Sequence, residues 1–537
     1  MVTRVGASPT AEKAATTTSR RPAKSAAAEV ARKAQKSLAR AVAGALGLSG
    51  ERMSKVDTAW LRMDCEANLM QIVGVWTLQP GLKHAAVRQR IEATLLHYDR
   101  FKQRVVQDAA GATWVPDQRF DMANHLVLES LLPAATGNQE AALQQRVAAL
   151  ATERLDPRRP LWQMHLIENY CGADGVPGSA LIVRIHHCIA DGIALIAVIM
   201  SLVDGGAPPI QLADGANAPP QPKDWLEDAV LKPFTQLAVK TLDAMGERAV
   251  RALSLLADPK KSMEHSLALG LRGSLDMGRS VLQVLSDSAA LALMPDDSKT
   301  RLKGKPGGVK KVAWCQPIPL DEVKAVGKAL GCSINDVLLS CVAGAIGEYL
   351  KAHGDAVAGQ EIRAMVPVSL RPQGGEGGHS HQLGNRFGLV PLVLPIGIDN
   401  PVERVYEVRR RMALLKGSYQ PLLAFSMLAV AGLLAKPAQD LMLNIFSKKT
   451  TAVMTNVPGP SNKLTFCGSV LEQAMFWVPQ SGDVGLGVSI LSYGGGVQFG
   501  VITDSSLCPE PRRLIDEFIP ALARLSMVTL MLPWSDA

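Results

Sequence analysis

The stretch RIHHCIADG, residues 184 to 192, restricts the possible folds of this chain more than any other segment. It lies between two apolar runs, ALIV and IALIAVIM, so its two histidines and its aspartate are expected to be buried. Buried polar groups are costly unless they are hydrogen-bonded or paired. The run SALIVRIHH is typical of a strand, and IALIAVIMSLVDG, apolar on every side, is typical of a buried helix that begins near Asp191 or Gly192. The motif is therefore predicted to occupy a strand-to-helix junction in an α/β fold.

Strand and helix patterns alternate before and after this junction. Those before it are a strand at 70–78, helices at 85–105 and 140–154, and a strand at 161–169. After the junction, strands are expected at 312–320, 362–370, 387–397, 451–460 and 498–504. Helices are expected within 226–294 and at 320–331, 401–416 and 510–527. A further helix is expected to begin at residue 333, with Ser333 as its N-cap.

A stretch rich in Pro, Gly and Ala, residues 205 to 225, separates two halves of comparable plan. We infer two α/β halves joined by a long crossover. The expected boundaries are a tail at 1–50, an N-terminal lobe at 51–204, a linker and helical connector at 205–300, and a C-terminal lobe at 301–537.

The first 40 residues carry nine Lys or Arg and two Glu, and so hold nearly all of the formal net charge of +8. With no aromatic residue and a bias toward Ala, Ser and Thr, this segment is expected to be a basic, solvated tail. It either attaches to an anionic membrane or lipid-droplet surface or has no partner, and a transit peptide is a minor alternative. It has no apolar core typical of a secretory signal, so we expect the protein not to be secreted.

The eight cysteines form no CxxC pair, which favours free thiols in a reducing, intracellular setting. No window reaches the roughly 18 apolar residues expected of a membrane-spanning helix. The nearest, residues 421 to 435, is interpreted as a core helix, with a membrane-dipping or tunnel-lining helix as the alternative.

The chemistry open to the motif is limited by what the chain lacks. Adjacent histidines point to opposite sides of a strand, and no HExxH pattern accompanies them, so a metal site at His186 and His187 is not expected. The HSH at 379–381 lies in a Gly-rich loop and is expected to face solvent. No GxSxG elbow supplies a nucleophilic serine. A histidine that acts as a base on an incoming hydroxyl remains.

The motif HHCIADG resembles HHxxxDG, which is shared by acyl-CoA-dependent acyltransferases, condensation domains and chloramphenicol acetyltransferase-like proteins. Further segments resemble the bacterial wax ester synthase/diacylglycerol acyltransferase family. They are SKVDTAWLRMD at 54–64, Pro160-Leu161-Trp162, Asn335-Asp336, GNRFG at 384–388 and TNVPGP at 455–460. The resemblance covers about residues 51 to 530, but not the tail, and it is loose over 205–300.

This resemblance implies two chloramphenicol-acetyltransferase-like lobes with a tunnel between them. It also implies an O-acyltransferase that moves a long-chain acyl group from acyl-CoA to a fatty alcohol, giving a wax ester, or to diacylglycerol, giving triacylglycerol. Acyl-CoA is then a substrate, and neither a cofactor nor a nucleic-acid partner is expected. The protein is expected in the cytoplasm, peripherally associated with the inner membrane or with lipid droplets. The alternatives are a carrier-protein thioester as donor, or a lipid-droplet protein without catalysis.

The resemblance also implies roles for single residues. His187 would be the general base, His186 a supporting group, and Asp191 an orienting carboxylate paired with a cation for which Arg184 is one candidate. Other residues keep two interpretations each. Thr455 and Asn456 either stabilise the oxyanion or shape a turn. Asn335 and Asp336 either line the site or cap a helix. Pro160, Leu161 and Trp162 either pack beneath the motif or contact substrate, and Gly192 supports the motif. The basic run from Lys299 to Lys311 could line a CoA entrance or simply be solvated. Acceptor preference, chain-length selectivity and oligomeric state are not encoded in these motifs.

Overall fold

The computed structural model describes residues 50–108, 111–131, 138–206, 294–369, 385, 387–416, 424, 439 and 447–531. The chain divides after Glu51 into two units, and the fold described here belongs to the second, Arg52–Ala537. The predicted basic tail, most of the connector, the HSH sequence and nearly all of the apolar run at 421–435 lie outside the described residues.

The histidine motif follows a central strand of a six-stranded sheet, whose order is β13-β14-β2-β7-β6-β5. Gln71 at the start of β2 pairs with His186 at the end of β7, so the motif lies at the end of the sheet where β2 begins and β7 ends. Neighbouring strands are antiparallel except for the parallel pair β5 and β6. The strands are β2 (Gln71–Gln79), β5 (Leu126–Glu129), β6 (Trp162–Cys171), β7 (Pro177–His186), β13 (Thr465–Phe466) and β14 (Ser469–Trp477).

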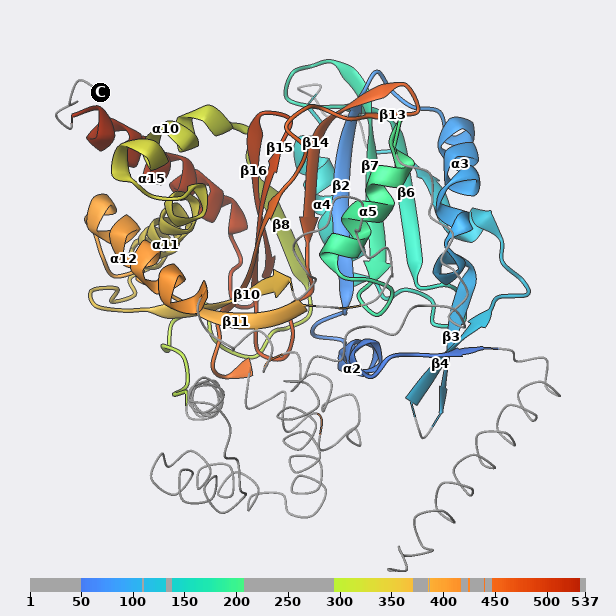
Figure 1. Cartoon of the computed structure of the whole chain (residues 1–537), viewed down its shortest axis with the longest axis horizontal. Coiled ribbons are helices and arrows are strands. Elements are labelled where there is room, and N and C mark those ends of the chain that lie inside the picture. The colour runs from blue at the N-terminus through green and yellow to red at the C-terminus, as the bar shows by residue number, and fades with distance from the viewer. Residues whose placement is uncertain are drawn as a thin grey trace, which may run out of the picture. The chain divides into compact units, whose positions relative to one another are not determined.

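Helices cover both faces of this sheet (Figure 1). Alternate residues of β2 point to opposite faces. Val73 and Val75 pack with the buried side of α4 (Glu140–Thr152), whereas Ile72 and Trp76 face α5 (Gly192–Leu202). The motif therefore connects a fully covered strand to one of the helices that covers it.

The predicted helix at 85–105 is too long. Helix α3 (His84–Ala93) ends at Ala93, because the φ and ψ of Thr94, −129° and −61°, are not helical. Two 3₁₀ turns follow, and the β-branched pair Val105-Val106 belongs to a strand, as β-branched side chains favour. Burial of Phe101 in the core overrides the helical periodicity. The elements around it are η1 (Leu95–His97), η2 (Asp99–Lys102), η3 (Met122–Asn124), β1 (Glu51–Arg52), β3 (Gln103–Asp108), β4 (Gly111–Pro116) and α2 (Lys55–Met63).

A second sheet has the order β11-β10-β12-β15-β16-β8, with β9 paired to β16. Its pairs β10–β12 and β12–β15 are parallel and the others are antiparallel. The strands are β8 (Lys310–Trp314), β9 (Ile318–Pro319), β10 (Ile362–Ser369), β11 (Phe387–Leu394), β12 (Ala452–Pro458), β15 (Leu486–Tyr493) and β16 (Gly496–Asp504).

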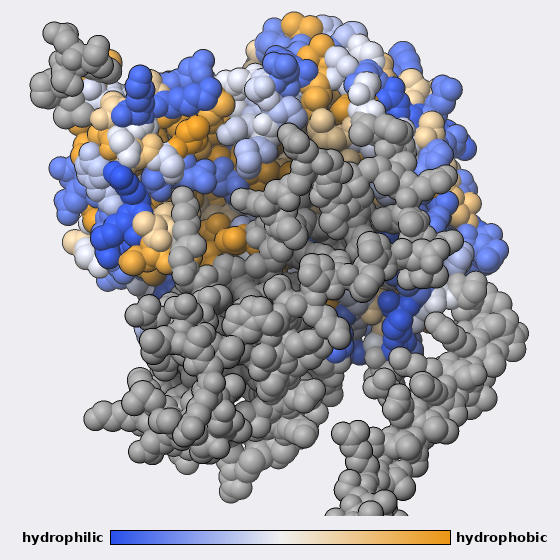
Figure 2. Space-filling model, viewed as in Figure 1, coloured by the Kyte–Doolittle hydropathy of each residue, from blue (hydrophilic) through white to orange (hydrophobic). Residues whose placement is uncertain are grey.

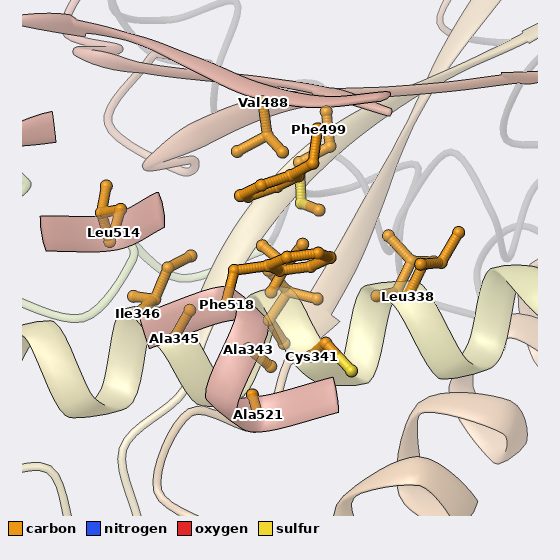
Figure 3. Packing of buried hydrophobic residues seen from close by; sticks show 14 of the residues in the cluster. Leu338, Cys341, Ala343, Ala345, Ile346, Val488, Phe499, Leu514, Phe518 and Ala521 are labelled. Atoms are coloured by element: carbon orange, nitrogen blue, oxygen red, sulfur yellow. The ribbon is translucent and has the colours of Figure 1, made fainter. Parts of the chain in front are cut away.

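Four helices gather beside the second sheet (Figure 1): α10 (Leu320–Leu330), α11 (Ile334–Ala352), α12 (Pro401–Lys416) and α15 (Pro511–Leu530). The core between sheet and helices includes Phe499 of β16 and Phe518 of α15, whose rings stack 3.7 Å apart (Figure 3). Ser333 caps α11 as predicted, since its hydroxyl accepts from the Asp336 amide at 3.2 Å and the Asp336 carboxylate accepts from the Ser333 amide at 2.9 Å.

The chain returns from the second half to complete the first sheet. Strands β13 and β14 lie beyond residue 301, in the predicted C-terminal lobe, yet β14 pairs with β2 along Val470–Trp477. This corrects the predicted division, because backbone hydrogen bonds assign these strands to the N-terminal sheet. Val73 and Val75 of that sheet share one apolar cluster with Trp314 and Ile502 of the other.

Among the described residues, no single helix is both long and apolar enough to cross a membrane. The pair α10 and α11 passes such a test together, but it bends by 100°. All eight cysteines are described, and none of them forms a disulfide.

Candidate active site

The loop from His187 to Asp191 joins β7 to α5 and is buried throughout. Asp191 is the N-cap of α5, with its Oδ1 accepting from the Ala194 amide at 2.8 Å. A carboxylate at this position satisfies a free amide and is favoured by the positive end of the helix dipole. The aspartate of the motif thus fixes where the loop ends and the helix begins.

Hydrogen bonds hold the backbone of His187 on both sides. Its amide donates to the Met70 carbonyl at 2.7 Å, and its carbonyl accepts from Asn385 Nδ2 at 2.8 Å. Its ring stacks on Trp60 with centroids 4.2 Å apart and planes 17° apart, and the Phe387 ring is 5.5 Å away. The imidazole is therefore held in place by groups from three separate parts of the sequence.

Burial determines the charge of His187. It lowers the pKa of the ring to about 4, although its own backbone carbonyl, Asp191 and Asn385 act in the opposite direction. The imidazole is therefore neutral near pH 7 and able to take up a proton. Burial raises the pKa of the adjacent Cys188 thiol well above its ordinary value, so this cysteine is not a thiolate nucleophile.

The contacts of His186 indicate a role in holding the loop in place. Its Nδ1 accepts from the Cys188 amide at 3.1 Å, and its Nε2 faces Asp64 Oδ1 at 4.0 Å. Asp64 also accepts from the Met70 amide at 2.8 Å and forms an ion pair with Arg154. Since Met70 in turn holds the His187 amide, these contacts link His186 and Asp64 to the backbone of the loop.

Arg184 lies on the other face of β7 and does not bind the helix-capping aspartate. Its guanidinium donates to Gln163 Oε1 at 3.0 Å and to Gln71 Oε1 at 3.3 Å, and it also donates to the Glu153 carbonyl. The candidate pairing of Arg184 with Asp191 is therefore wrong. Strand alternation explains the result, because Arg184 points toward the α4 side of the sheet while Val183 and Ile185 face α5.

Pro160, Leu161 and Trp162 are buried beside the motif. The Leu161 carbonyl accepts from the His186 amide at 2.9 Å, and Trp162 Nε1 donates to the Phe101 carbonyl at 2.8 Å. The segment thus supports the end of β7 through its backbone and packing. Gly192 is the first residue of α5 and lines an apolar cavity.

The structure brings Asn335 and Asn456 together, since Asn456 Nδ2 donates to Asn335 Oδ1 at 2.9 Å. Thr455 donates to the Val488 carbonyl at 3.3 Å, and Asp336 belongs to the capping box of α11. Among the described residues, none of the hydrogen bonds of these four side chains reaches the histidine motif. Their predicted roles at the reacting atoms stay predictions.

Three residues at the centre of the site were not singled out by sequence reasoning: Asp57, Trp60 and Asn385. Asn385 Nδ2 bridges Asp57 Oδ1, at 2.7 Å, and the His187 carbonyl. Burial raises the pKa of Asp57, while its hydrogen bonds to Ser54 and Asn385 lower it. The segments SKVDTAWLRMD and GNRFG contain these residues, but their motifs alone do not indicate which side chains meet.

Polar atoms without partners gather around His187. Trp60 Nε1, His187 Nδ1, Asn385 Oδ1 and Gln439 Oε1 are buried and have no hydrogen-bond partner in the structure as described. Gln439 is tied to this group because its Nε2 donates to the Ala59 carbonyl at 3.3 Å. Buried polar atoms in folded proteins are nearly always satisfied, and exceptions call for an explanation such as a bound polar ligand or water.

An apolar cavity of about 110 Å³ begins beside the motif. Its walls come from α5, from the facing side of β2 and β7, and from the segment 459–476, and nearly all the exposed atoms inside it are apolar. Gly192 lines one end and Leu202 the other, ten residues along the helix, which corresponds to about 15 Å. The cavity can hold an alkyl chain but not a charged group.

Two family models match the chain, and together they include every element of this site. The wax ester synthase/diacylglycerol acyltransferase catalytic domain matches residues 53–338, and the C-terminal domain of the same family matches residues 383–526. The chain belongs to the wax ester synthase/diacylglycerol acyltransferase family. The prediction of an enzyme of the acyltransferase class is thereby confirmed.

Relatives within the wax ester synthase/diacylglycerol acyltransferase family are distant in sequence but similar over most of their length. A protein of Mycobacterium tuberculosis named as a probable diacylglycerol O-acyltransferase is 26% identical over 437 residues, which is 80% of this chain and 85% of the relative. A second relative from the same species is 27% identical over 486 residues, covering 88% of this chain and 99% of the relative.

Solved structures confirm the α/β fold. The wax ester synthase/diacylglycerol acyltransferase of Marinobacter aquaeolei VT8 aligns with a TM-score of 0.60 at 20% identity, over 89% of this chain and 99% of that one. The first condensation domain of the calcium-dependent antibiotic synthetase aligns with a TM-score of 0.53 at 14% identity, over 89% and 97%. The fold is therefore shared with condensation domains.

Replacement of Asn385 by alanine is expected to lower both stability and kcat. It leaves the buried Asp57 carboxylate and the His187 carbonyl short of a donor, which costs about 1–3 kcal/mol. As a matched control, Asn400→Ala removes a side chain that accepts from the Val402 and Glu403 amides at the start of α12, at a cost of about 1 kcal/mol. Melting temperature and kcat of both variants are the measurement; equal loss of kcat in the two would contradict a specific role for Asn385.

Proposed function

We propose that this chain transfers a long-chain acyl group from acyl-CoA to the hydroxyl of a fatty alcohol or a diacylglycerol, for the synthesis of storage lipids. The observation that carries the proposal is the neutral, buried His187 imidazole, at a junction from which an apolar cavity runs along α5. The base can take the proton of the hydroxyl of one lipid substrate, which then attacks the thioester of the other. The cavity next to the base can hold an alkyl chain of one of these substrates.

In the proposed reaction His187 Nε2 takes the proton of the acceptor hydroxyl, because Nδ1 is enclosed. The hydroxyl oxygen attacks the thioester carbonyl carbon and forms a tetrahedral intermediate. When the carbon–sulfur bond breaks, the imidazolium returns the proton to the departing CoA thiolate. Asp191 would act by fixing the loop and the start of α5 rather than by touching substrate.

The negative charge on the tetrahedral oxygen needs nearby donors, whose loss in other enzymes costs about 10²–10³ in rate. Trp60 Nε1, a buried donor without a partner among the described residues, is one candidate. The amide of Asn456, paired with Asn335, stays the candidate from the second half of the chain, with Thr455 beside it in β12. The reaction so written needs no metal or resident cofactor, and no cluster of metal-ligating side chains occurs in the described ranges.

We further propose that the enzyme works at the cytoplasmic side of the inner membrane or at lipid droplets. Hydrophobic and hydrophilic residues are interspersed on the visible described surface (Figure 2). The outer side of α15 exposes Ile519, Met527 and Leu530, with Met527 at 64% and Leu530 at 70% exposure. These residues, spaced along one helix, could bury in a lipid surface, and the basic tail could add attraction to anionic lipids.

The test is turnover by the purified protein with palmitoyl-CoA and either hexadecanol or a diacylglycerol. Release of CoA thiol together with formation of a wax ester or a triacylglycerol supports the proposal, and the ratio of the two rates gives the acceptor preference. Ester formation only from a carrier-protein thioester would replace acyl-CoA as donor. Lipid binding without ester from any donor would indicate a binding protein.

The depressed pKa of His187 predicts activity that persists into mildly acidic solution. Because the base must be unprotonated, kcat is expected to fall only as the pH approaches the folded pKa of about 4, and not near the ordinary value of 6.5. The measurement is kcat against pH, restricted by circular dichroism to the range in which the protein is folded. An acid limb centred near 6.5 would show that His187 is not the titrating base.

The same shifts predict acid destabilisation. Burial lowers the pKa of His186 to about 3 and that of His187 to about 4, so between these values and 6.5 the unfolded chain binds more protons than the folded one. The free energy of unfolding therefore falls as the pH is lowered through this range.

A further inference from the structure

Tyr493 lines the apolar cavity next to Leu471, which pairs with Leu78 at the end of β2 away from the motif. Tyr493 is the last residue of β15 and pairs with Gly496 across a two-residue turn, Gly494-Gly495, in which both glycines have positive φ, 58° and 80°. Positive φ at both turn positions is the geometry of a tight hairpin that glycine adopts without strain. The turn thus fixes where β15 ends and where the Tyr493 side chain starts.

A second cavity, of about 420 Å³, lies on the other side of this residue. Its lining is mixed: the polar side chains of Gln79, Asp174, Lys463 and Glu472 lie beside apolar residues. Among the described residues, Tyr493 is the one that lines both cavities. Tyr493 therefore lies between the two cavities.

Tyr493 is a rigid wall. It is only 3% exposed, its hydroxyl donates to the Leu471 carbonyl at 2.8 Å, and it accepts from the Leu464 amide at 2.8 Å. Leu464 and Leu471 lie on either side of the short hairpin formed by β13 and β14. Two hydrogen bonds to backbone atoms leave the ring no freedom to swing aside while that hairpin is intact.

We propose that Tyr493 sets the longest alkyl chain that the enzyme accepts, by ending the apolar cavity. The inference rests on the proposed function, since it takes the cavity to hold a substrate chain. That chain belongs either to the acyl group or to the fatty alcohol, and both have the same chemistry. A chain that reaches Tyr493 must stop or clash, and overfilling a packed interior costs binding energy.

The experiment compares Tyr493→Ala with Tyr493→Phe. Alanine opens the apolar cavity into the second cavity, whereas phenylalanine keeps the ring and removes only the hydroxyl. In one series the acyl-CoA length varies with a fixed alcohol, and in the other the alcohol length varies with a fixed acyl-CoA. The kcat/KM profile and the melting temperature are measured for each variant.

For Tyr493→Ala we expect kcat/KM for chains beyond the wild-type limit to rise about tenfold or more relative to the wild-type optimum, in one of the two series. The profile should level off rather than peak at a new length, because methylene groups that emerge into the wider, partly polar second cavity gain less burial than those in the apolar one. For Tyr493→Phe we expect a lower melting temperature and an unchanged length limit. An unchanged limit in folded Tyr493→Ala, or the same shift in both variants, overturns the inference.

Gly74→Val gives an independent test if Tyr493→Ala does not fold. Gly74 lines the cavity midway along β2, and a Cβ there meets its nearest atom, the Met475 carbonyl oxygen, at 3.4 Å, which is ordinary contact. The Cβ therefore fits without a backbone shift, and the two methyl groups that valine adds to it are expected to narrow the cavity and move the limit to shorter chains in the same series. No shift would show that the cavity holds no chain and would overturn the inference. Absence of wild-type turnover with every acyl-CoA would instead overturn the proposed function.

Discussion

Replacement of His187 by alanine is expected to lower kcat about 10²–10⁴-fold, the usual contribution of a positioned acid–base group. The imidazole is neutral, stacked on Trp60 and enclosed on its Nδ1 side, so its loss removes the base that the proposed reaction requires. KM should change little, because the ring contributes to the transition state more than to binding of the alkyl chains. The measurement is the rate of CoA thiol release and of ester formation with palmitoyl-CoA and hexadecanol.

His186→Ala provides the control for loss of a buried imidazole. It removes the acceptor of the Cys188 amide, which costs about 1 kcal/mol of stability, but it leaves the proposed base in place. Its kcat should therefore stay well above that of His187→Ala at a temperature where both are folded. A larger loss of kcat in His186→Ala than in His187→Ala would reverse the assignment of the two histidines.

Replacement of Phe518 by alanine is expected to destabilise the protein by about 3–5 kcal/mol, the usual cost of emptying a buried aromatic site. The ring is fully buried and stacks on Phe499 at 3.7 Å, with only 13° between the planes, so α15 loses a main contact to the second sheet (Figure 3). Urea unfolding followed by circular dichroism measures the change.

The adjacent Ile519 gives a matched control. It lies on the same helix but is 46% exposed, so Ile519→Ala should change stability by less than about 0.5 kcal/mol. A loss below about 1 kcal/mol in Phe518→Ala would show that the space between α15 and the sheet collapses around the smaller side chain.

The strand-to-helix junction at the motif could be predicted because its signals are local. An apolar strand, two histidines, a capping aspartate and an all-apolar helix follow one another without interruption, and the structure has β7 ending at His186 and α5 starting at Gly192. Likewise, Ser333 precedes Asp336 at capping-box spacing, and it caps α11. Where neighbours in sequence determine the structure, the prediction was correct.

Features that depend on distant segments could not be predicted. Nothing near Asn385 indicates that its amide bridges Asp57 and His187, 328 and 198 residues away. Arg184 was one candidate partner of Asp191, yet its guanidinium donates to Gln71, Gln163 and Glu153. The helix expected at 85–105 stops at Ala93 because the burial of Phe101 outweighs local periodicity.

The pairing of β14 with β2 determines when the enzyme can become active during its synthesis. Val73 pairs with Trp477, so the edge of β2 stays open until more than four hundred further residues have been added. Contacts of such large sequence separation form slowly, and an open strand edge is prone to join other chains. The histidine motif is therefore translated long before its sheet is complete, and the edge of β2 is exposed to other chains until β14 has left the ribosome.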